Sequence, residues 1–176
     1  TKGPNILAGI EALRKMHIRS IKETHLTAAD EMLYPENYAF LHDILSYVAI
    51  GARSVENQQH RLVSSGIDFP VGMKNPTSDF SVMLNAIYAA QSAHTFLYRD
   101  KEVSTHGNPL AHAILRGYVN KHGQSLPNYH YEDLEFLADM YYKKNVLNPF
   151  VVVDVNHANS AKIYSEQPRI VKEVLH

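Results

Sequence analysis

Short apolar runs alternate with longer amphipathic segments along most of the chain. In the first amphipathic segment, Ile6, Ile10, Leu13 and Met16 recur at helical spacing, which predicts a helix over roughly residues 5–24. Five apolar runs that end in polar residues, glycine or proline predict strands, at LTAADEML (26–33), YVAIGARS (47–54), FPVGMKNP (69–76), HAILRG (112–117) and PFVVVDVNHAN (149–159).

The segments between these runs predict the remaining elements. Helices are expected at 36–45, 55–66, 78–91, 131–145 and 160–176, a strand pair at 94–109, and a polar loop at 118–129. The helix at 78–91 should be capped by Ser78 or Asp79. Its expected apolar face consists of Phe80, Met83, Leu84, Ile87 and Tyr88.

Strands and helices that follow one another in turn are typical of an α/β fold with a parallel sheet and right-handed crossovers. No linker or low-complexity segment divides the chain, so we expect a single domain over residues 1–176. A partial barrel and a doubly wound sheet both satisfy this pattern. In either fold, ligands bind beyond the carboxyl ends of the strands.

Composition narrows the possible partners and compartment. The net charge of −1 gives no reason to expect binding to nucleic acid or to an acidic membrane. The chain has no cysteine, which excludes a disulfide framework or a thiolate site within it. Because there is also no apolar run near 18 residues and no signal-peptide pattern, we expect a cytoplasmic protein.

Charged side chains stand at the ends of five successive predicted strands, in the order Glu31, Arg53, Lys74, Arg116 and His157. Any one of them alone is more often a solvated loop residue or half of an ion pair. Three cations at the same edge of the predicted sheet are harder to explain in that way, because Arg and Lys are suited to binding phosphate and carboxylate. The pattern predicts a site for a phosphorylated or multiply anionic small molecule.

His157 by itself is a weak signal, because a single loop histidine is more often structural than a metal ligand. A metal site needs at least three protein ligands, and only Glu31 is an evident neighbour. The sequence contains no GxGxxG or Walker loop and no GxSxG elbow.

Five motifs carry a family resemblance across nearly the whole chain, namely ADEMLYPEN, AIGARSVENQQHR, PVGMKNPTS, GNPLAHAILRG and VNHANS. With these motifs in this order, the chain closely resembles class I 3-deoxy-7-phosphoheptulonate (DAHP) synthase. The resemblance implies a (β/α)₈ TIM barrel that condenses phosphoenolpyruvate with erythrose 4-phosphate and releases phosphate, as the first step of aromatic amino-acid biosynthesis. It also implies a divalent metal ion (Mn, Fe, Co or Zn). The two unpaired edges of a sheet of five strands separately lead us to expect a homo-oligomer.

The resemblance assigns roles to residues of the matched motifs. Ala52, Arg53, Lys74 and Arg116 resemble the substrate-binding residues. Lys74 and Glu31 resemble catalytic residues, and His157 resembles a metal ligand.

The five predicted strands match the third to seventh strands of the family's barrel. The first strand with its GPCS motif, the second with its KPRT segment and the eighth with its acidic metal ligands have no counterpart here. We therefore expect an incomplete barrel domain, a fragment of a synthase that is inactive alone. Two alternatives stay open, a non-catalytic remnant that binds phosphate or assembles with itself, and a Schiff-base aldolase that uses Lys74.

Overall fold

A parallel sheet of five strands in the order β1-β2-β3-β6-β9 forms the centre of the computed structural model, which describes residues 5–176. Its strands are β1 (Ala28–Glu31), β2 (Leu45–Ile50), β3 (Val71–Lys74), β6 (His112–Leu115) and β9 (Val151–Val153). All four pairings in this sheet are parallel, as the alternating pattern predicts. The first four residues of the expected domain lie outside the described residues.

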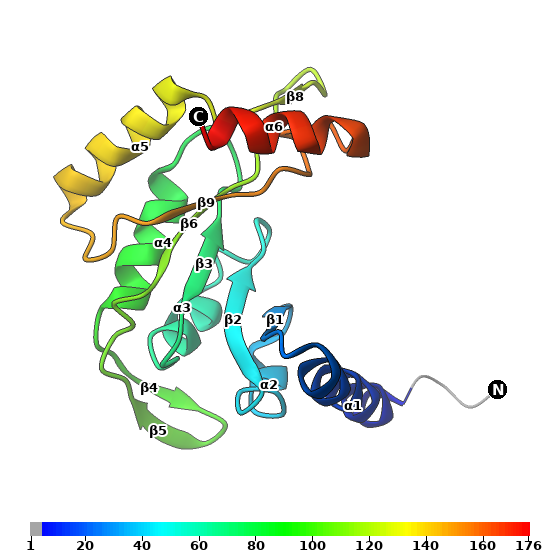
Figure 1. The fold of residues 1–176 in the computed structure, drawn as a ribbon. Helices are drawn as coiled ribbons and strands as arrows, with labels where there is room; N and C mark the ends of the chain where they lie inside the picture. Colours follow the sequence, from blue (N-terminus) through cyan, green and yellow to red (C-terminus); the bar gives the residue numbers. More distant parts are fainter. Residues whose placement is uncertain (1–4) are drawn as a thin grey trace.

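Helices lie on one face of the sheet, beside β1 and across the carboxyl ends of the strands (Figure 1). They are α1 (Ile6–Thr24), α2 (Pro35–Tyr38), α3 (Gln58–Ser64), α4 (Ser81–Gln91), α5 (Tyr131–Lys144) and α6 (Gln167–Val174), the last preceded by a 3₁₀ turn, η1 (Tyr164–Glu166). Helix α4 packs on β3 and β6 and is flanked by α3 and α5. The main core lies between these helices and the strands, where Met73, Met83, Ile87 and Leu137 are fully buried or nearly so.

Two antiparallel hairpins extend from the sheet at opposite ends (Figure 1). The expected strand pair is present as β4 (Thr95–Tyr98) and β5 (Lys101–Ser104). The second hairpin, β7 (Tyr118–Val119) with β8 (Ser125–Leu126), lies where only a polar loop was predicted.

The face of the sheet opposite the helices is filled by aromatic and aliphatic side chains towards the amino ends of the strands. The Tyr47 hydroxyl lies 2.8 Å from Nε2 of His112, whose Nδ1 donates to the Leu110 carbonyl at 2.9 Å. Burial raises the pKa of Tyr47 to about 12 and lowers the pKa of His112. A Cβ at Gly72 would overlap both the Tyr47 hydroxyl and Ile114, so this layer has no spare room. The carboxyl ends of the strands, by contrast, surround a hollow.

Two sequence predictions were wrong in extent. The helix expected at 36–45 stops at Tyr38, because backbone turns follow and β2 already begins at Leu45. The helix expected at 160–176 is confined to Gln167–Val174, since positive φ angles at Ala161 and Lys162 interrupt any earlier helix.

The start of α4 was predicted nearly correctly. Asp79, not Ser78, binds its first turn, because its Oδ1 accepts the Ser81 N–H at 2.8 Å. Tyr88, expected on the apolar face, is 53% exposed, while Phe80 and Leu84 are buried.

None of the helices in the part of the chain that the structure describes is both long enough and apolar enough to cross a membrane.

Candidate anion-binding site

A hollow of about 640 Å³ opens at the carboxyl ends of the five strands. Each strand, or the turn after it, contributes a charged or ionisable side chain to this hollow, which we call the mouth. Those side chains are Glu31, Arg53, Lys74, Arg116, His157 and Lys162. Ala52 and Gly51 also line it. The structure therefore brings together all the site residues that were predicted from the sequence.

Lys74 is fixed at the mouth by an ion pair with Glu31. The Lys74 side chain is only 13% exposed and Glu31 is 41% exposed, so the pair is partly shielded from water. The carboxylate lies against Gly51, where a Cβ would come within 2.5 Å of its Oε1. Absence of a side chain at position 51 therefore lets Glu31 reach Lys74.

Asn75 joins the ends of β3 and β6. Its Oδ1 accepts the Arg116 N–H at 2.9 Å, and its Nδ2 donates to the carbonyls of Gly117 and Thr77 at 3.0 Å. Since Asn75 is fully buried, these bonds are shielded from water. They hold Lys74 and Arg116, which flank this junction, on neighbouring strands of one surface.

His157 enters the mouth from the turn after β9. Its Nδ1 lies 2.7 Å from Oδ2 of Asp154, and the residue adopts a left-handed conformation with φ of 46°. An imidazole held through Nδ1 by a carboxylate has a fixed ring orientation, with Nε2 left for another partner.

The same turn is attached to β6 by Asn159, which is almost completely buried. Its Nδ2 donates to the carbonyls of Leu115 and Asp154 at 3.1 and 2.8 Å. Its Oδ1 accepts the Asn128 N–H at 3.0 Å, and Asn128 in turn accepts the Gly117 N–H at 2.7 Å. The positions of Arg116 and His157 are thus coupled through buried amides.

The mouth carries an excess of positive charge. Within residues 5–176, Arg53, Arg116 and Lys162 form no ion pair with a carboxylate, whereas Lys74 is balanced by Glu31. A concave surface with three unbalanced cations favours a small ligand bearing more than one negative charge.

Sequence reasoning missed Lys162 and the buried asparagines Asn75, Asn128 and Asn159. Lys162 follows no apolar strand directly, so its position gave no signal. Asn75 and Asn159 belong to the quoted motifs PVGMKNPTS and VNHANS. The one clue to their role in the sequence is that each follows a predicted site residue closely, Asn75 after Lys74 and Asn159 after His157.

His157 does not belong to a complete metal site within the residues that the structure describes. Among them, no three His, Cys, Asp or Glu side chains are grouped so that they could hold a metal ion. His157 and its partner Asp154 thus do not fit a bound metal on their own.

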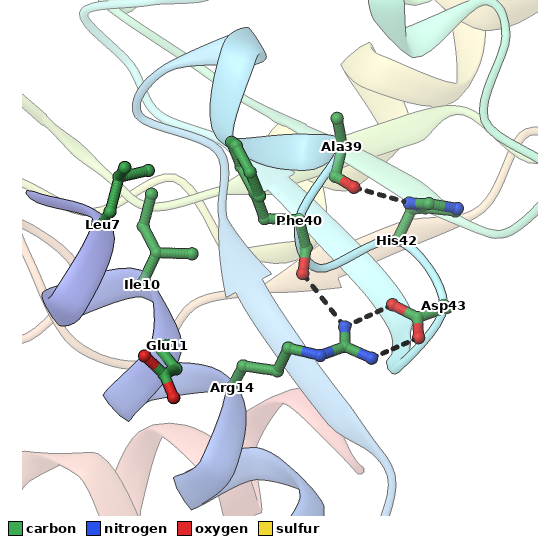
Figure 2. Close-up of a pocket in the computed structure, with 8 residues that line it drawn as sticks. All are labelled: Leu7, Ile10, Glu11, Arg14, Ala39, Phe40, His42 and Asp43. Atoms are coloured by element: carbon green, nitrogen blue, oxygen red, sulfur yellow. Dashed lines mark hydrogen bonds and ion pairs between the residues drawn. The ribbon is translucent and has the colours of Figure 1, made fainter.

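A second hollow, of about 560 Å³, lies between α1 and the segment that joins α2 to β2 (Figure 2). The Arg14 guanidinium, which lines this hollow, already has partners. It donates to both carboxylate oxygens of Asp43 at 2.5 Å and to the Phe40 carbonyl at 3.0 Å. Figure 2 shows Leu7 and Ile10 on the α1 side of the hollow, across from Phe40. This hollow is mainly apolar and lacks the unbalanced cations of the mouth.

The fold and the mouth together define a partial (β/α)₈ barrel with a hollow lined by cations at the carboxyl ends of its strands. Residues 7–176 match the profile of the DAHP synthetase I family, and the chain belongs to that family.

Named relatives agree with this assignment. The chain is 40% identical over 173 residues to a phospho-2-dehydro-3-deoxyheptonate aldolase of Haemophilus influenzae, covering 94% of the chain and 46% of the relative. It is 34% identical to the Tyr-sensitive enzyme of that name from Escherichia coli, covering 97% of the chain and 48% of the relative. A solved phospho-2-dehydro-3-deoxyheptonate aldolase from Francisella tularensis superposes with a TM-score of 0.87 at 29% identity, over 98% of this chain and 50% of that one. The chain thus spans about half the length of the relatives that it matches.

Proposed function

We propose that this chain carries the phosphoenolpyruvate-binding part of a DAHP synthase. In the proposed reaction, phosphoenolpyruvate condenses with erythrose 4-phosphate and phosphate is released, which is the first step of aromatic amino-acid biosynthesis. The observation that carries the proposal is the convergence of Arg53, Lys74 and Arg116 on one hollow in a chain of this family.

The proposed substrate suits the charge of the mouth. Phosphoenolpyruvate carries a phosphate and a carboxylate, and arginine binds either group through two parallel N–H···O bonds. We assign these contacts to Arg53 and Arg116, because neither is engaged by a carboxylate among the described residues. Ala52, beside Arg53 at the wall of the hollow, completes the proposed binding surface.

Lys74 and Glu31 are the proposed catalytic pair. In this proposal the Lys74 ammonium stabilises the negative charge of the phosphate group that leaves in the reaction, and Glu31 orients the ammonium. Its low exposure would make Lys74 a fixed charge that needs little reorganisation when the substrate binds.

A divalent metal ion (Mn, Fe, Co or Zn) also belongs to the proposal, at the level of a complete barrel. If bound there, such an ion would supply a Lewis acid. His157 would contribute Nε2 to it, with Asp154 holding the ring through Nδ1. Because the described residues supply no group of three ligands, we propose that the isolated chain is inactive.

The proposal places the protein in the cytoplasm, where phosphorylated metabolites of this kind are handled, and as a homo-oligomer. The competing function is a non-catalytic remnant whose mouth still binds a phosphorylated acid. A Schiff-base aldolase is disfavoured, because the Lys74 amine is engaged by Glu31 rather than free to attack a carbonyl.

Phosphate release and ligand binding, measured on the same preparation, separate these functions. We expect the chain to bind phosphoenolpyruvate and to release no phosphate when erythrose 4-phosphate and Mn²⁺ are added. Phosphate release that requires all three additions would establish a complete enzyme in this chain alone. Absence of phosphoenolpyruvate binding would refute the proposed function. A borohydride-stable adduct on Lys74 would establish the aldolase instead.

A further inference from the structure

Lys162 is an additional cation at the mouth, and the matched motifs gave it no role. It lines the same hollow as Arg53, Lys74 and Arg116. It lies five residues beyond His157 and is exposed there. Within the described residues it makes no ion pair with a carboxylate, so its charge is available to a ligand.

The backbone that presents Lys162 is unusual. Ala161 and Lys162 adopt consecutive left-handed conformations, with φ of 50° and 62°, and His157 has φ of 46°. Residues with a Cβ seldom adopt this conformation, and each such residue carries a conformational cost that the surrounding structure must offset. Three of them within six residues indicate a turn whose shape is imposed by its contacts.

Those contacts attach the turn to the mouth. The Lys162 N–H donates to the His157 carbonyl at 2.8 Å, which closes the turn on itself. The Ala158 N–H donates to the Arg116 carbonyl at 3.1 Å, and Asn159 donates to the Leu115 carbonyl at 3.1 Å. The backbone that carries Lys162 is therefore joined directly to the backbone that carries Arg116.

We propose that Lys162 binds an anionic oxygen of the ligand held by Arg53 and Arg116, as a positioning residue for a phosphorylated carboxylic acid. This inference rests on the proposed function and adds a residue to it. A lysine suits this position because its flexible stem can bring a compact charge from the rim to a ligand oxygen.

Calorimetric titration of phosphoenolpyruvate into the 176-residue chain tests the role of Lys162. We expect Lys162→Met to weaken binding about tenfold, because a charge-assisted hydrogen bond is lost. Lys162→Arg should restore most of the affinity. Added salt should weaken binding to the wild type more than to Lys162→Met, since one fewer cation is left to be screened. A purely structural role would not produce this difference in salt dependence.

The matched control is Lys101→Met, which removes an exposed lysine from β5, in the hairpin at the other end of the sheet (Figure 1). It should bind like the wild type. Inorganic phosphate and pyruvate, titrated separately, identify which group Lys162 contacts, since the affinity of only one should depend on it. If Lys162→Met destabilises the fold, Lys162→Gln provides the same comparison.

Binding within twofold of the wild type in a folded Lys162→Met or Lys162→Gln variant would overturn this inference and leave the proposed function standing. Failure of the wild-type chain to bind phosphoenolpyruvate would instead refute the proposed function itself. The two failures are therefore distinguishable in one series of titrations.

Discussion

Buried amides, rather than the charged groups themselves, set the geometry of the mouth. Asn75 uses both ends of its side chain to join β3 to β6. Asn159 joins β6 to the turn after β9 through its Nδ2, and its Oδ1 accepts from Asn128. Such groups are costly to leave unpaired when buried, so each forms a specific connection that apolar packing could not provide.

Asn75→Ala should therefore lower the free energy of unfolding by about 1–3 kcal/mol, because the Arg116 N–H and the Gly117 carbonyl lose their partner. It should also weaken phosphoenolpyruvate binding, since Lys74 and Arg116 would no longer be held in register. Urea denaturation and calorimetry measure the two effects. Asn156→Ala, at an exposed position of the nearby turn, is the control and should change neither quantity appreciably. Equal stability of the two variants would contradict this account of Asn75.

Helix α1 makes few contacts with the rest of the chain. None of its residues is buried, and few of its residues contact β1. Its firmest tie is Arg14, which donates to Asp43 and to the Phe40 carbonyl across the hollow shown in Figure 2. The guanidinium lowers the pKa of the Asp43 carboxyl to about 2.

The contribution of this pair to α1 docking should depend on pH in a definite direction. Because the folded-state pKa of Asp43 is depressed, the contribution is present above the unfolded value near 4 and is lost as pH falls towards 2. An NMR titration of the Asp43 carboxyl should give a pKa near 2 in the wild type and an ordinary value in Arg14→Met. Lys15→Met, which removes the neighbouring ion pair with Glu11, should leave the Asp43 titration unchanged. An ordinary pKa in the wild-type chain would show that the Arg14–Asp43 pair does not persist in solution.

Whether a helix or strand could be predicted from the sequence depends on what stabilises it. Helices α4 and α5 and the five strands were predicted because their apolar periodicity records burial against one core. The segment 39–44 was predicted as helix because its composition favours one, but tertiary contacts such as that of Arg14 with the Phe40 carbonyl hold it in turns. The left-handed residues at 157, 161 and 162 are likewise set by contacts with β6, which local sequence does not encode.

The same distinction applies to the site. Parallel topology places strand ends at one edge, so the convergence of Glu31, Arg53, Lys74, Arg116 and His157 could be predicted. Lys162 could not, because it reaches the mouth through a turn rather than from a strand end.

At the scale of the whole molecule, the sheet ends in two strands that each pair on one side only within the described residues, β1 and β9. An edge strand presents unpaired N–H and C=O groups that can pair with another chain. This geometry supports the homo-oligomer proposed above, formed through one or both edges.

Ala29→Pro tests the contribution of the β1 edge. The Met32 N–H donates to Ala49 of β2, so by alternation the Ala29 N–H points away from the sheet and can be removed without loss of a β1–β2 bond. Sedimentation should show that the wild-type chain associates as its concentration rises and that Ala29→Pro associates less. Ala29→Ser, which keeps the N–H at this exposed position, is the control. Identical sedimentation of all three proteins would exclude the β1 edge as the contact.

The central claim is that cations at the carboxyl ends of the strands form a site for a phosphorylated acid. Calorimetric titration of phosphoenolpyruvate into the wild-type chain and into Arg116→Met, at low and high salt, tests it most directly. The account predicts saturable binding at a single site that salt weakens, and affinity at least about tenfold lower in Arg116→Met, because one charge-assisted contact is lost. Undetectable binding by the wild-type chain, or equal affinity in Arg116→Met, would contradict it.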